Sequence, residues 1–162
     1  MTLPVVILAL VTLERLFELW LAARNTRRLV ARGAVEHGRG HYPLLVALHV
    51  AWLVALWWLA PPRPVDGFWL AMLVLLILAR IWVIATLGSR WTTRIIVLPD
   101  EPLVKRGPYR WLAHPNYVVV VGEIAVLPLV FGLWQVALVF SALNIALLWV
   151  RVRAENKALG RA

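Results

Sequence analysis

Five long apolar stretches, divided by short polar segments, are the feature that most limits what this sequence can fold into. A helix needs about 20 mostly apolar residues to cross a bilayer, with a range of about 17 to 25. The stretches cover about 3–23, 43–60, 68–87, 116–130 and 132–150. We therefore predict an all-α, polytopic integral membrane protein with five transmembrane helices, folded as a single domain over residues 1–162.

The fourth stretch is short for a spanning helix, and Pro128 lies near its end. We expect it to form a tight helical hairpin with the fifth stretch, turning near Phe131 and Gly132. The alternative is that the two short stretches form one buried re-entrant element.

Composition agrees with a membrane protein. Ordinary soluble domains are about half apolar and about a quarter charged, whereas this chain is 62% hydrophobic and 15% charged. The chain has no cysteine. That excludes disulfides, a thiol nucleophile and a thiolate metal site.

The basic residues predict an orientation. The net charge is +9, and the Lys and Arg residues gather in the segments 24–42, 88–115 and 151–162, while 61–67 holds only Arg63. Basic loops stay in the cytoplasm, so we expect an outside N-terminus and a cytoplasmic C-terminus in a bacterial plasma membrane. Membrane topology explains these segments better than nucleic-acid binding, which we do not expect. The N-terminus has no basic region or convincing cleavage site, so we expect no removable signal peptide.

Charged residues interrupt several of the apolar stretches. A charge at the centre of a spanning helix costs about 2.5–3.5 kcal/mol, so such groups must be paired, lie near the interface or face a wet cavity. Helical spacing puts Glu14 and Glu18 on one face and allows Arg15 to pair with Glu18. The ionisable residues that we place in the inner half of the membrane are Glu14, Arg15, Glu18, His49, Arg80 and Glu123.

Two interpretations of these charges stay open, and they are compatible. One is a set of interhelical ion pairs. The other is a polar cavity that opens to the cytoplasm, with Glu14 and Glu18 as residues on the substrate side.

The polar connection from Gly88 to His114 is too long for a simple link between neighbouring helices. It contains prolines and a glycine, which interrupt helices, and a short β-like run, RIIVLP. We predict that this segment is a cytoplasmic loop with a function of its own.

A helix is predicted to begin at Pro115, because proline suits the first helical position. His114, Asn116 and Tyr117 would then lie at a helix N-terminus, where free N–H groups suit an anionic ligand group. The alternative is that His-Pro only starts a helix, and that Tyr109 and Tyr117 are interfacial aromatic residues.

The segment GPYRWLAHPNY, followed by an apolar hairpin and then RVRAENKAL, resembles the isoprenylcysteine carboxyl methyltransferase family. That family and the related phospholipid methyltransferases carry GPY(R) and HPxY elements before the final hairpin and a Glu-Glu signature after it. The resemblance covers about Thr86 to Leu159. The first half, including EHGRGHYPLLVALH, is similar to a bacterial branch whose relatives methylate hydroxyl groups of long-chain polyketide lipids.

Two positions depart from the family pattern. Ala113 stands where family members usually have an arginine, and Asn156 replaces the second glutamate. The lost carboxylate would weaken cofactor binding or alter the substrate, unless asparagine accepts the same hydrogen bonds.

The resemblance implies an S-adenosylmethionine-dependent O-methyltransferase with a lipid acceptor, whose cofactor elements are the cytoplasmic segments 88–115 and 151–162. Methyl transfer depends largely on holding two partners aligned in a dry pocket, and the sequence suggests no metal site. By motif match, the cofactor pocket would be formed by Tyr109, His114, Pro115, Asn116, Tyr117, Glu155 and Asn156.

The remaining roles are also expectations from this resemblance. Arg110 would hold a carboxyl group of cofactor or substrate. Arg151 and Arg153 either steer a substrate carboxylate and balance Glu155, or act only as topology signals. An ionised carboxylate acceptor needs no base, whereas a phenol or enol needs one, and Glu123 or His114 is the candidate.

Two other functions are compatible with the sequence. A small proton-coupled transporter would use intramembrane charges, although the sequence has no internal repeat. A non-catalytic relative of the family is the second alternative. The acceptor itself stays open between a prenylated cysteine carboxyl, a polyketide hydroxyl and a phospholipid amine, and the other expected partners are membrane lipids.

Overall fold

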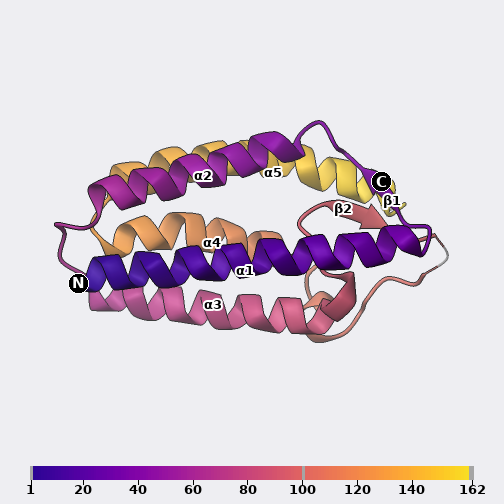
Figure 1. Cartoon of the computed structure of the whole chain (residues 1–162), viewed down its shortest axis with the longest axis horizontal. Coiled ribbons are helices and arrows are strands. Elements are labelled where there is room, and N and C mark those ends of the chain that lie inside the picture. Colours follow the sequence, from indigo (N-terminus) through magenta and orange to yellow (C-terminus); the bar gives the residue numbers. More distant parts are fainter. Residues whose placement is uncertain (1, 100, 161–162) are drawn as a thin grey trace.

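Five α-helices lie along the long axis of the molecule (Figure 1). The computed structural model describes residues 2–99 and 101–160. The N-terminus of the helical bundle lies at one end and the C-terminus at the other (Figure 1). The helices are α1 (Leu3–Ala31), α2 (Tyr42–Leu59), α3 (Gly67–Leu87), α4 (Pro115–Val130) and α5 (Trp134–Ala158).

The predicted apolar stretches correspond to these five helices, and most boundaries agree within two residues. Two helices run on beyond the apolar stretch: α1 continues to Ala31 and α5 continues to Ala158. Apolar composition cannot reveal such extensions, because their residues are polar. Both extensions contact the functional region described below.

Of the described helices, three are long and apolar enough to cross a membrane: α2, the segment Gly67–Arg90 that contains α3, and α5. Helix α4 is apolar but has only 16 residues. Helix α1 has 29 residues and carries three charged side chains, Glu14, Arg15 and Glu18, in its apolar part. The structure therefore indicates a mostly helical membrane protein.

The hairpin of α4 and α5 turns where the sequence predicts. Gly132 has a φ of 67°, a conformation that glycine adopts without a steric penalty. The Gly132 N–H donates to Leu129 O at 3.0 Å, and the Leu133 N–H donates to Pro128 O at 2.9 Å. These two bonds cap the end of α4 and redirect the chain into α5.

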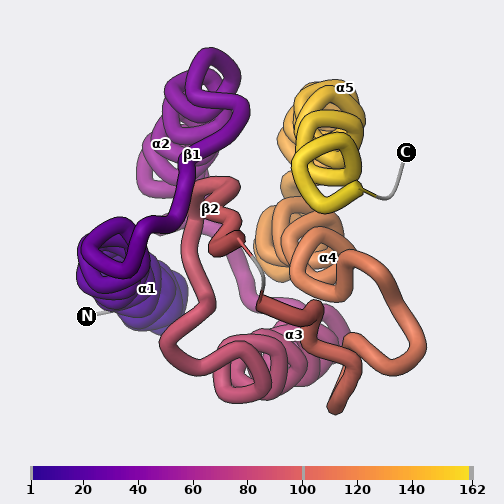
Figure 2. The backbone as a smooth tube through the Cα atoms, turned by 90° about the vertical axis from the view of Figure 1, so that its right-hand side faces the viewer, coloured from indigo at the N-terminus to yellow at the C-terminus, as the bar shows by residue number. Residues whose placement is uncertain are grey.

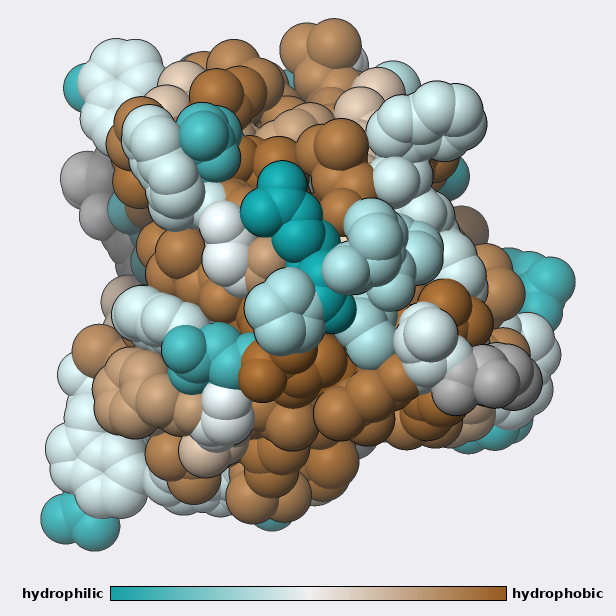
Figure 3. All heavy atoms as spheres, turned by 90° about the vertical axis from the view of Figure 1, so that its left-hand side faces the viewer, coloured by the Kyte–Doolittle hydropathy of each residue, from teal (hydrophilic) through white to brown (hydrophobic). Residues whose placement is uncertain are grey.

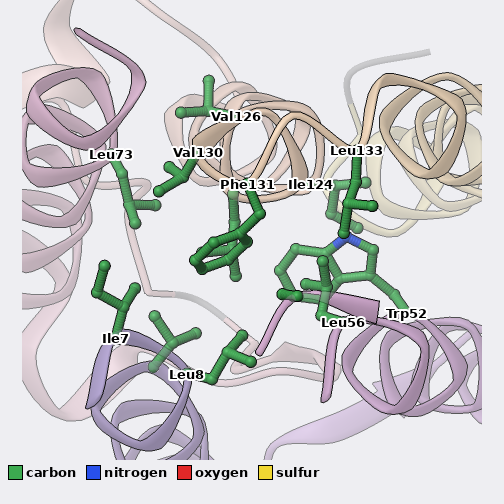
Figure 4. Packing of buried hydrophobic residues seen from close by; sticks show 13 residues of the cluster. Ile7, Leu8, Trp52, Leu56, Leu73, Ile124, Val126, Val130, Phe131 and Leu133 are labelled. Atoms are coloured by element: carbon green, nitrogen blue, oxygen red, sulfur yellow. The ribbon is translucent and has the colours of Figure 1, made fainter. Parts of the chain in front are cut away.

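The hydrophobic core lies at the end of the bundle that holds this turn (Figure 4). Phe131 occupies its centre at 1% exposure, with Leu8 of α1, Leu56 of α2 and Leu73 of α3 pointing towards it (Figure 4). The Asp66 N–H donates to Val130 O at 2.8 Å, which joins the start of α3 to the end of α4. Seen end-on, this end of the molecule presents mainly apolar and weakly polar residues (Figure 3).

The opposite end carries a small sheet that the all-α prediction missed. Strand β1 (Val35–His37) pairs antiparallel with β2 (Ile95–Val97), and Glu36 lies opposite Ile96. Seen along the helices, the sheet lies over the middle of the bundle (Figure 2). It joins the α1–α2 connection to the α3–α4 connection, which are distant in sequence. The RIIVLP run indicated one strand, but its three-residue partner has no recognisable pattern.

The GPYR element is held against α3 by a close approach at Gly107. This residue has a φ of 54°, and an added Cβ would lie 2.6 Å from Thr86 Oγ1. The Thr86 hydroxyl donates to Trp82 O at 2.7 Å, so it is not free to move aside. Both the backbone conformation and the space therefore require glycine here.

We expect Gly107→Ala to destabilise the protein by about 1–3 kcal/mol, because it forces a non-glycine residue into a left-handed conformation. The measurement is the thermal unfolding midpoint of the purified protein in detergent. Gly40→Ala is the matched control, since an added Cβ there meets nothing within 4 Å. Equal stability of the two variants would contradict this description of the GPYR turn.

Candidate functional site

A polar cavity of about 110 Å³ lies at the end of the bundle that holds the sheet. Three parts of the chain form its walls: the 87–97 segment that contains β2, the 109–117 segment that leads into α4, and the C-terminal part of α5. Its polar side chains include arginines, tyrosines, a histidine and a carboxylate: Arg90, Arg94, Tyr109, His114, Asn116, Tyr117, Arg151 and Glu155.

Helix α4 begins at Pro115, directly after His114, as predicted. His114 and Tyr117 are therefore one turn apart, and their rings stack with centroids 5.3 Å apart and planes 17° apart. His114 Nε2 lies 2.9 Å from Asn156 Oδ1, and its Nδ1 lies 3.7 Å from Glu155 Oε1. The HPNY motif and the C-terminal motif thus meet, although they are about 40 residues apart.

Arg151 connects the walls of this cavity. Its Nε donates to the Tyr117 hydroxyl at 2.8 Å, and its Nη2 donates to Thr93 O at 2.6 Å. The Tyr117 hydroxyl in turn donates to Glu155 Oε2. Because Arg151 is only 7% exposed, these bonds hold a buried positive charge and fix α4, α5 and the 87–97 segment against each other.

Tyr109 is a neutral hydrogen-bonding group at this site. Burial raises the pKa of its phenol above the ordinary value, and the negative charge of Glu155 raises this pKa further. The Tyr109 side chain therefore keeps its proton across the physiological pH range and can act as a donor, but not as a phenolate base.

A second, larger cavity has a volume of about 260 Å³. It is lined mainly by α1 and α2, and residues of α3, α4 and α5 complete its wall. Most of its surface is apolar, and Leu16, Leu19 and Val50 at its edge are also exposed on the surface of the helices. The Trp57 indole N–H donates to Thr12 Oγ1 at 3.1 Å and joins α1 to α2 at one end. The Tyr42 hydroxyl lies 3.0 Å from Thr93 Oγ1 at the other end.

The two cavities adjoin each other. Of the described residues, four line both: Trp91, Asn116, Tyr117 and Arg151. A polar compartment that faces the loops and an apolar compartment that faces the helix surfaces are therefore separated by a single layer of side chains. We call these four residues the boundary.

The charges inside the helices form one connected cluster. Arg80 Nε contacts both Glu123 oxygens, at 2.9 and 3.0 Å, and lies 3.4 Å from Glu18 Oε1. Arg15 lies 2.8 Å from Glu18, 3.0 Å from Glu123 and 3.4 Å from Glu14. The cluster joins α1, α3 and α4, and three of its members, Arg15, Glu18 and Arg80, also line the larger cavity. The same residues therefore form interhelical ion pairs and line a cavity.

The structure brings together many of the residues predicted for the site. Tyr109, His114, Asn116, Tyr117 and Glu155 line the polar cavity. Pro115 and Asn156 are adjacent to it, and Asn156 contacts His114. Arg151 lines both cavities, and Glu18 lines the larger one.

Four predicted residues lie elsewhere. Arg110 and Arg153 are exposed, and their guanidinium groups lie over the rings of Trp111 and Trp149. Glu14 and Glu123 belong to the ion cluster and line neither cavity.

Sequence reasoning missed several residues of the site. Arg90 and Arg94 line the polar cavity but were interpreted only as part of the basic segment 88–115 that predicts the orientation, and Trp91 was not among the predicted site residues. Asn25, in the extension of α1, is 1% exposed and donates to Trp91 O at 2.8 Å. The available signal was a single asparagine among arginines, which does not by itself indicate a buried contact.

Residues 2–99 and 101–160 contain no group of three or more His, Asp or Glu side chains that could hold a metal ion. The site is instead built from aromatic rings, arginines and one carboxylate.

The model of the isoprenylcysteine carboxyl methyltransferase family matches residues 69–161, more than half of the chain. The chain belongs to this family. The matched region contains all of the polar-cavity side chains named above. The chain is also similar to the uncharacterized protein YpbQ of Bacillus subtilis, at 36% identity over 94% of each chain. An uncharacterized protein of Haemophilus influenzae is 28% identical over 90% of this chain and 88% of its own length. No solved structure matches the chain.

Membership in this family confirms the resemblance drawn from GPYRWLAHPNY and RVRAENKAL. The relatives also extend the similarity to α1 and α2, which lie before the family match, because the Bacillus subtilis protein covers nearly the whole chain. Both helices line the larger cavity, so the similarity includes both compartments of the site.

We expect Arg80→Ala to destabilise the protein by about 3–5 kcal/mol, because it leaves the buried Glu123 with Arg15 as its remaining charged partner. The double variant Arg80→Ala/Glu123→Ala should lose less than the sum of the two single variants, as measured by denaturant unfolding. Arg63→Ala, at an exposed position, is the control and should change stability by no more than about 0.5 kcal/mol. Strict additivity of the two cluster variants would show that the ion pair is not coupled.

Proposed function

We propose that this protein is an integral-membrane, S-adenosylmethionine-dependent methyltransferase that acts on an oxygen, carboxyl or hydroxyl, of a membrane-embedded lipidic acceptor. The observation that carries this proposal is the boundary, where a polar cavity and an apolar cavity are separated by four side chains. A reaction between a water-soluble donor and a lipid needs this arrangement. Family membership supports the same reaction class.

The donor set of the polar cavity fits the chemistry of the cofactor. S-Adenosylmethionine supplies a methyl group on a sulfonium cation, and it also carries a carboxylate, an ammonium group and a ribose. Glu155 is a hydrogen-bond acceptor for the ribose or the ammonium group, and the rings of Tyr109 and Tyr117 attract a cation. Arg90 and Arg94 line the same cavity and suit a carboxylate.

This assignment revises two roles expected from the family resemblance. Arg90 and Arg94 replace Arg110 as the candidates for holding a carboxyl group, because Arg110 is exposed and lines neither cavity. Glu123 becomes a positioning residue, because its carboxylate is paired with Arg80 and Arg15. In that position it holds Arg80 on the wall of the larger cavity.

The larger cavity is our candidate for the acceptor's apolar tail. Most of its surface is apolar, with aliphatic residues of α1 and α2 among those that line it, and its edge is exposed on the helix surfaces that would face lipid. A lipophilic small molecule or a prenylated acceptor would place its tail here and its polar end at the boundary. Burial of the tail would supply most of the binding free energy.

Catalysis in such a site depends on how the methyl donor and the acceptor are positioned. The boundary residues are buried or partly buried, so they exclude water from the space between the two partners. Arg151 and Tyr117 are fixed by hydrogen bonds, so the geometry is set before the reactants arrive. Alignment in a dry site supplies a large share of the rate enhancement for a displacement of this kind.

We propose that all five helices cross or enter the membrane, with the sheet and the polar cavity on the cytoplasmic side. The basic residues are concentrated at that end, and Arg63 is the basic residue of the α2–α3 connection at the other. This gives an outside N-terminus and a cytoplasmic C-terminus by the positive-inside rule. Both relatives come from bacteria, and we propose the plasma membrane of a bacterium as the location.

The alternative functions receive less support. Ion pairing gives the intramembrane charges a role in holding helices together, which weakens the argument for a proton-coupled transporter. Asn156 contacts His114 at 2.9 Å, so this departure from the family pattern still provides a hydrogen-bonding partner. That contact weakens the argument for a non-catalytic relative.

We expect S-adenosylhomocysteine to stabilise the purified protein by about 2.7 kcal/mol at a hundredfold excess over its Kd, measured as a rise in the thermal unfolding midpoint. His114→Ala and Glu155→Ala should abolish this stabilisation, because both residues line the polar cavity. Glu123→Gln should retain it, because Glu123 lies outside that cavity. An unchanged midpoint of the unmodified protein at saturating ligand would overturn the proposal, and equal loss in all three variants would overturn the division of roles.

A further inference from the structure

Three arginines at the end of the molecule that holds the polar cavity lie over the rings of exposed tryptophans. The pairs are Arg24 with Trp20, Arg110 with Trp111, and Arg153 with Trp149. The distance from the guanidinium carbon to the ring centroid runs from 3.5 to 5.9 Å. Because all three tryptophans are exposed, these Trp–Arg pairs lie on the outer surface of the bundle.

The Trp–Arg pairs lie at one height of the bundle and on different sides of it. At about 1.5 Å per residue, Trp20 of α1 and Trp149 of α5 lie about 22–26 Å from the start of their helices. Trp111 contacts Trp82, with ring centroids 6.0 Å apart, and Trp82 lies at a similar distance from the start of α3. Helices α1, α3 and α5 lie on different sides of the bundle (Figure 2). A ring of tryptophans at one height is typical of a membrane–water interface.

The helices themselves hold two of the guanidinium groups at this height. Residues 20–24 and 149–153 both read Trp-x-x-x-Arg. Helical side chains lean towards the N-terminus of their helix, so the arginine lies over the tryptophan four residues before it. Arg24 and Arg153 are in this way kept beside the rings instead of extending into water. A guanidinium stacked on a ring keeps its N–H edge free to bind an anion.

The three arginines form no ion pair with a carboxylate in residues 2–99 and 101–160. The arginines of the two long connections differ in this respect. Glu36 pairs with two of them and Glu101 with two others. The positive charge of the Trp–Arg pairs is therefore available for an anion that the described part of the chain does not supply.

We propose that the Trp–Arg pairs bind the headgroup phosphates of anionic phospholipids, with phosphatidylglycerol as the simplest example, in the cytoplasmic leaflet. Each pair offers a guanidinium to the phosphate and an indole to the interfacial region beneath it. Lipids fit these positions because they surround a bundle at one height, whereas one protein partner would cover one side. Phosphatidylcholine carries its own cation beside the phosphate, so it should bind more weakly.

This inference goes beyond methyl transfer. It requires only that the end of the bundle with the sheet lies at a membrane surface. The sites are also separate from the reaction site, because Arg24, Arg110 and Arg153 line neither cavity.

The test measures lipid preference in nanodiscs of phosphatidylcholine that contain increasing fractions of phosphatidylglycerol with brominated acyl chains. Bromine quenches tryptophans next to it, so quenching reports how strongly the protein selects phosphatidylglycerol. The variant Arg24→Gln/Arg110→Gln/Arg153→Gln removes three guanidinium groups and keeps every tryptophan. We expect its preference for phosphatidylglycerol to fall at least about fivefold, the contribution of one basic residue at an anionic membrane surface. An unchanged preference would overturn the inference.

The matched control is Arg27→Gln/Arg28→Gln/Lys157→Gln. It removes the same charge from exposed positions at the same end, and none of these residues lies over an aromatic ring of the described chain. Its preference should fall by no more than about twofold, because these charges are not held at the interface. An equal fall in both variants would show attraction by net charge alone and would contradict specific sites.

A competition experiment separates lipid from soluble phosphate. Excess glycerol 3-phosphate in the buffer should leave the quenching by brominated phosphatidylglycerol unchanged, because the sites face the bilayer. Complete loss of the selective quenching would indicate sites for soluble phosphates and would overturn the assignment to lipid.

Binding of S-adenosylhomocysteine separates this inference from the proposed function and checks the fold of the variant. The variant without the three guanidinium groups should keep the ligand-induced rise in the unfolding midpoint. Selection of phosphatidylglycerol by the unmodified protein without any binding of S-adenosylhomocysteine would support the lipid sites and count against methyl transfer. Binding of S-adenosylhomocysteine without lipid selection would overturn the lipid sites and leave the proposed function in place.

Discussion

The buried guanidinium of Arg151 is the interaction on which the functional region depends. It connects α5 to Tyr117 at the start of α4 and to Thr93 in the connection before it. A charge this deeply buried is stable only with several hydrogen bonds, so these three segments cannot separate without a large cost. The same side chain lines both cavities, so the group that holds the site together also charges the point where donor and acceptor would meet.

The ion cluster of α1, α3 and α4 helps to keep a cavity open inside a thin bundle. An apolar cavity between helices tends to collapse because its walls gain contact by closing. Arg15, Glu18 and Arg80 form one wall and are fixed by ion pairs, so that wall keeps its position. Helix α1 in this way joins both compartments, through the ion cluster in its middle and through Asn25 in its extension.

The sequence was sufficient for the five helices and for part of the site, because apolar length and motifs are local signals. Apolar length predicted the five helices, and His-Pro predicted the start of α4 at Pro115. The family motifs predicted that His114, Tyr117 and Glu155 would lie together. The pairing of β1 with β2, the contact of Asn25 with Trp91 and the larger cavity depend on which helices are neighbours, and a single sequence carries no local signal for that.

The central claim is that a methyl group passes across the boundary from a soluble donor to a lipid. The most direct measurement is to incubate membranes that contain the protein with methyl-labelled S-adenosylmethionine and a lipid extract, and then to identify the labelled product. We predict label in an organic-soluble methyl ester or methyl ether, which is absent from membranes that contain His114→Ala. Label that stays entirely in the aqueous phase, or that enters lipid equally with the variant, would contradict the account.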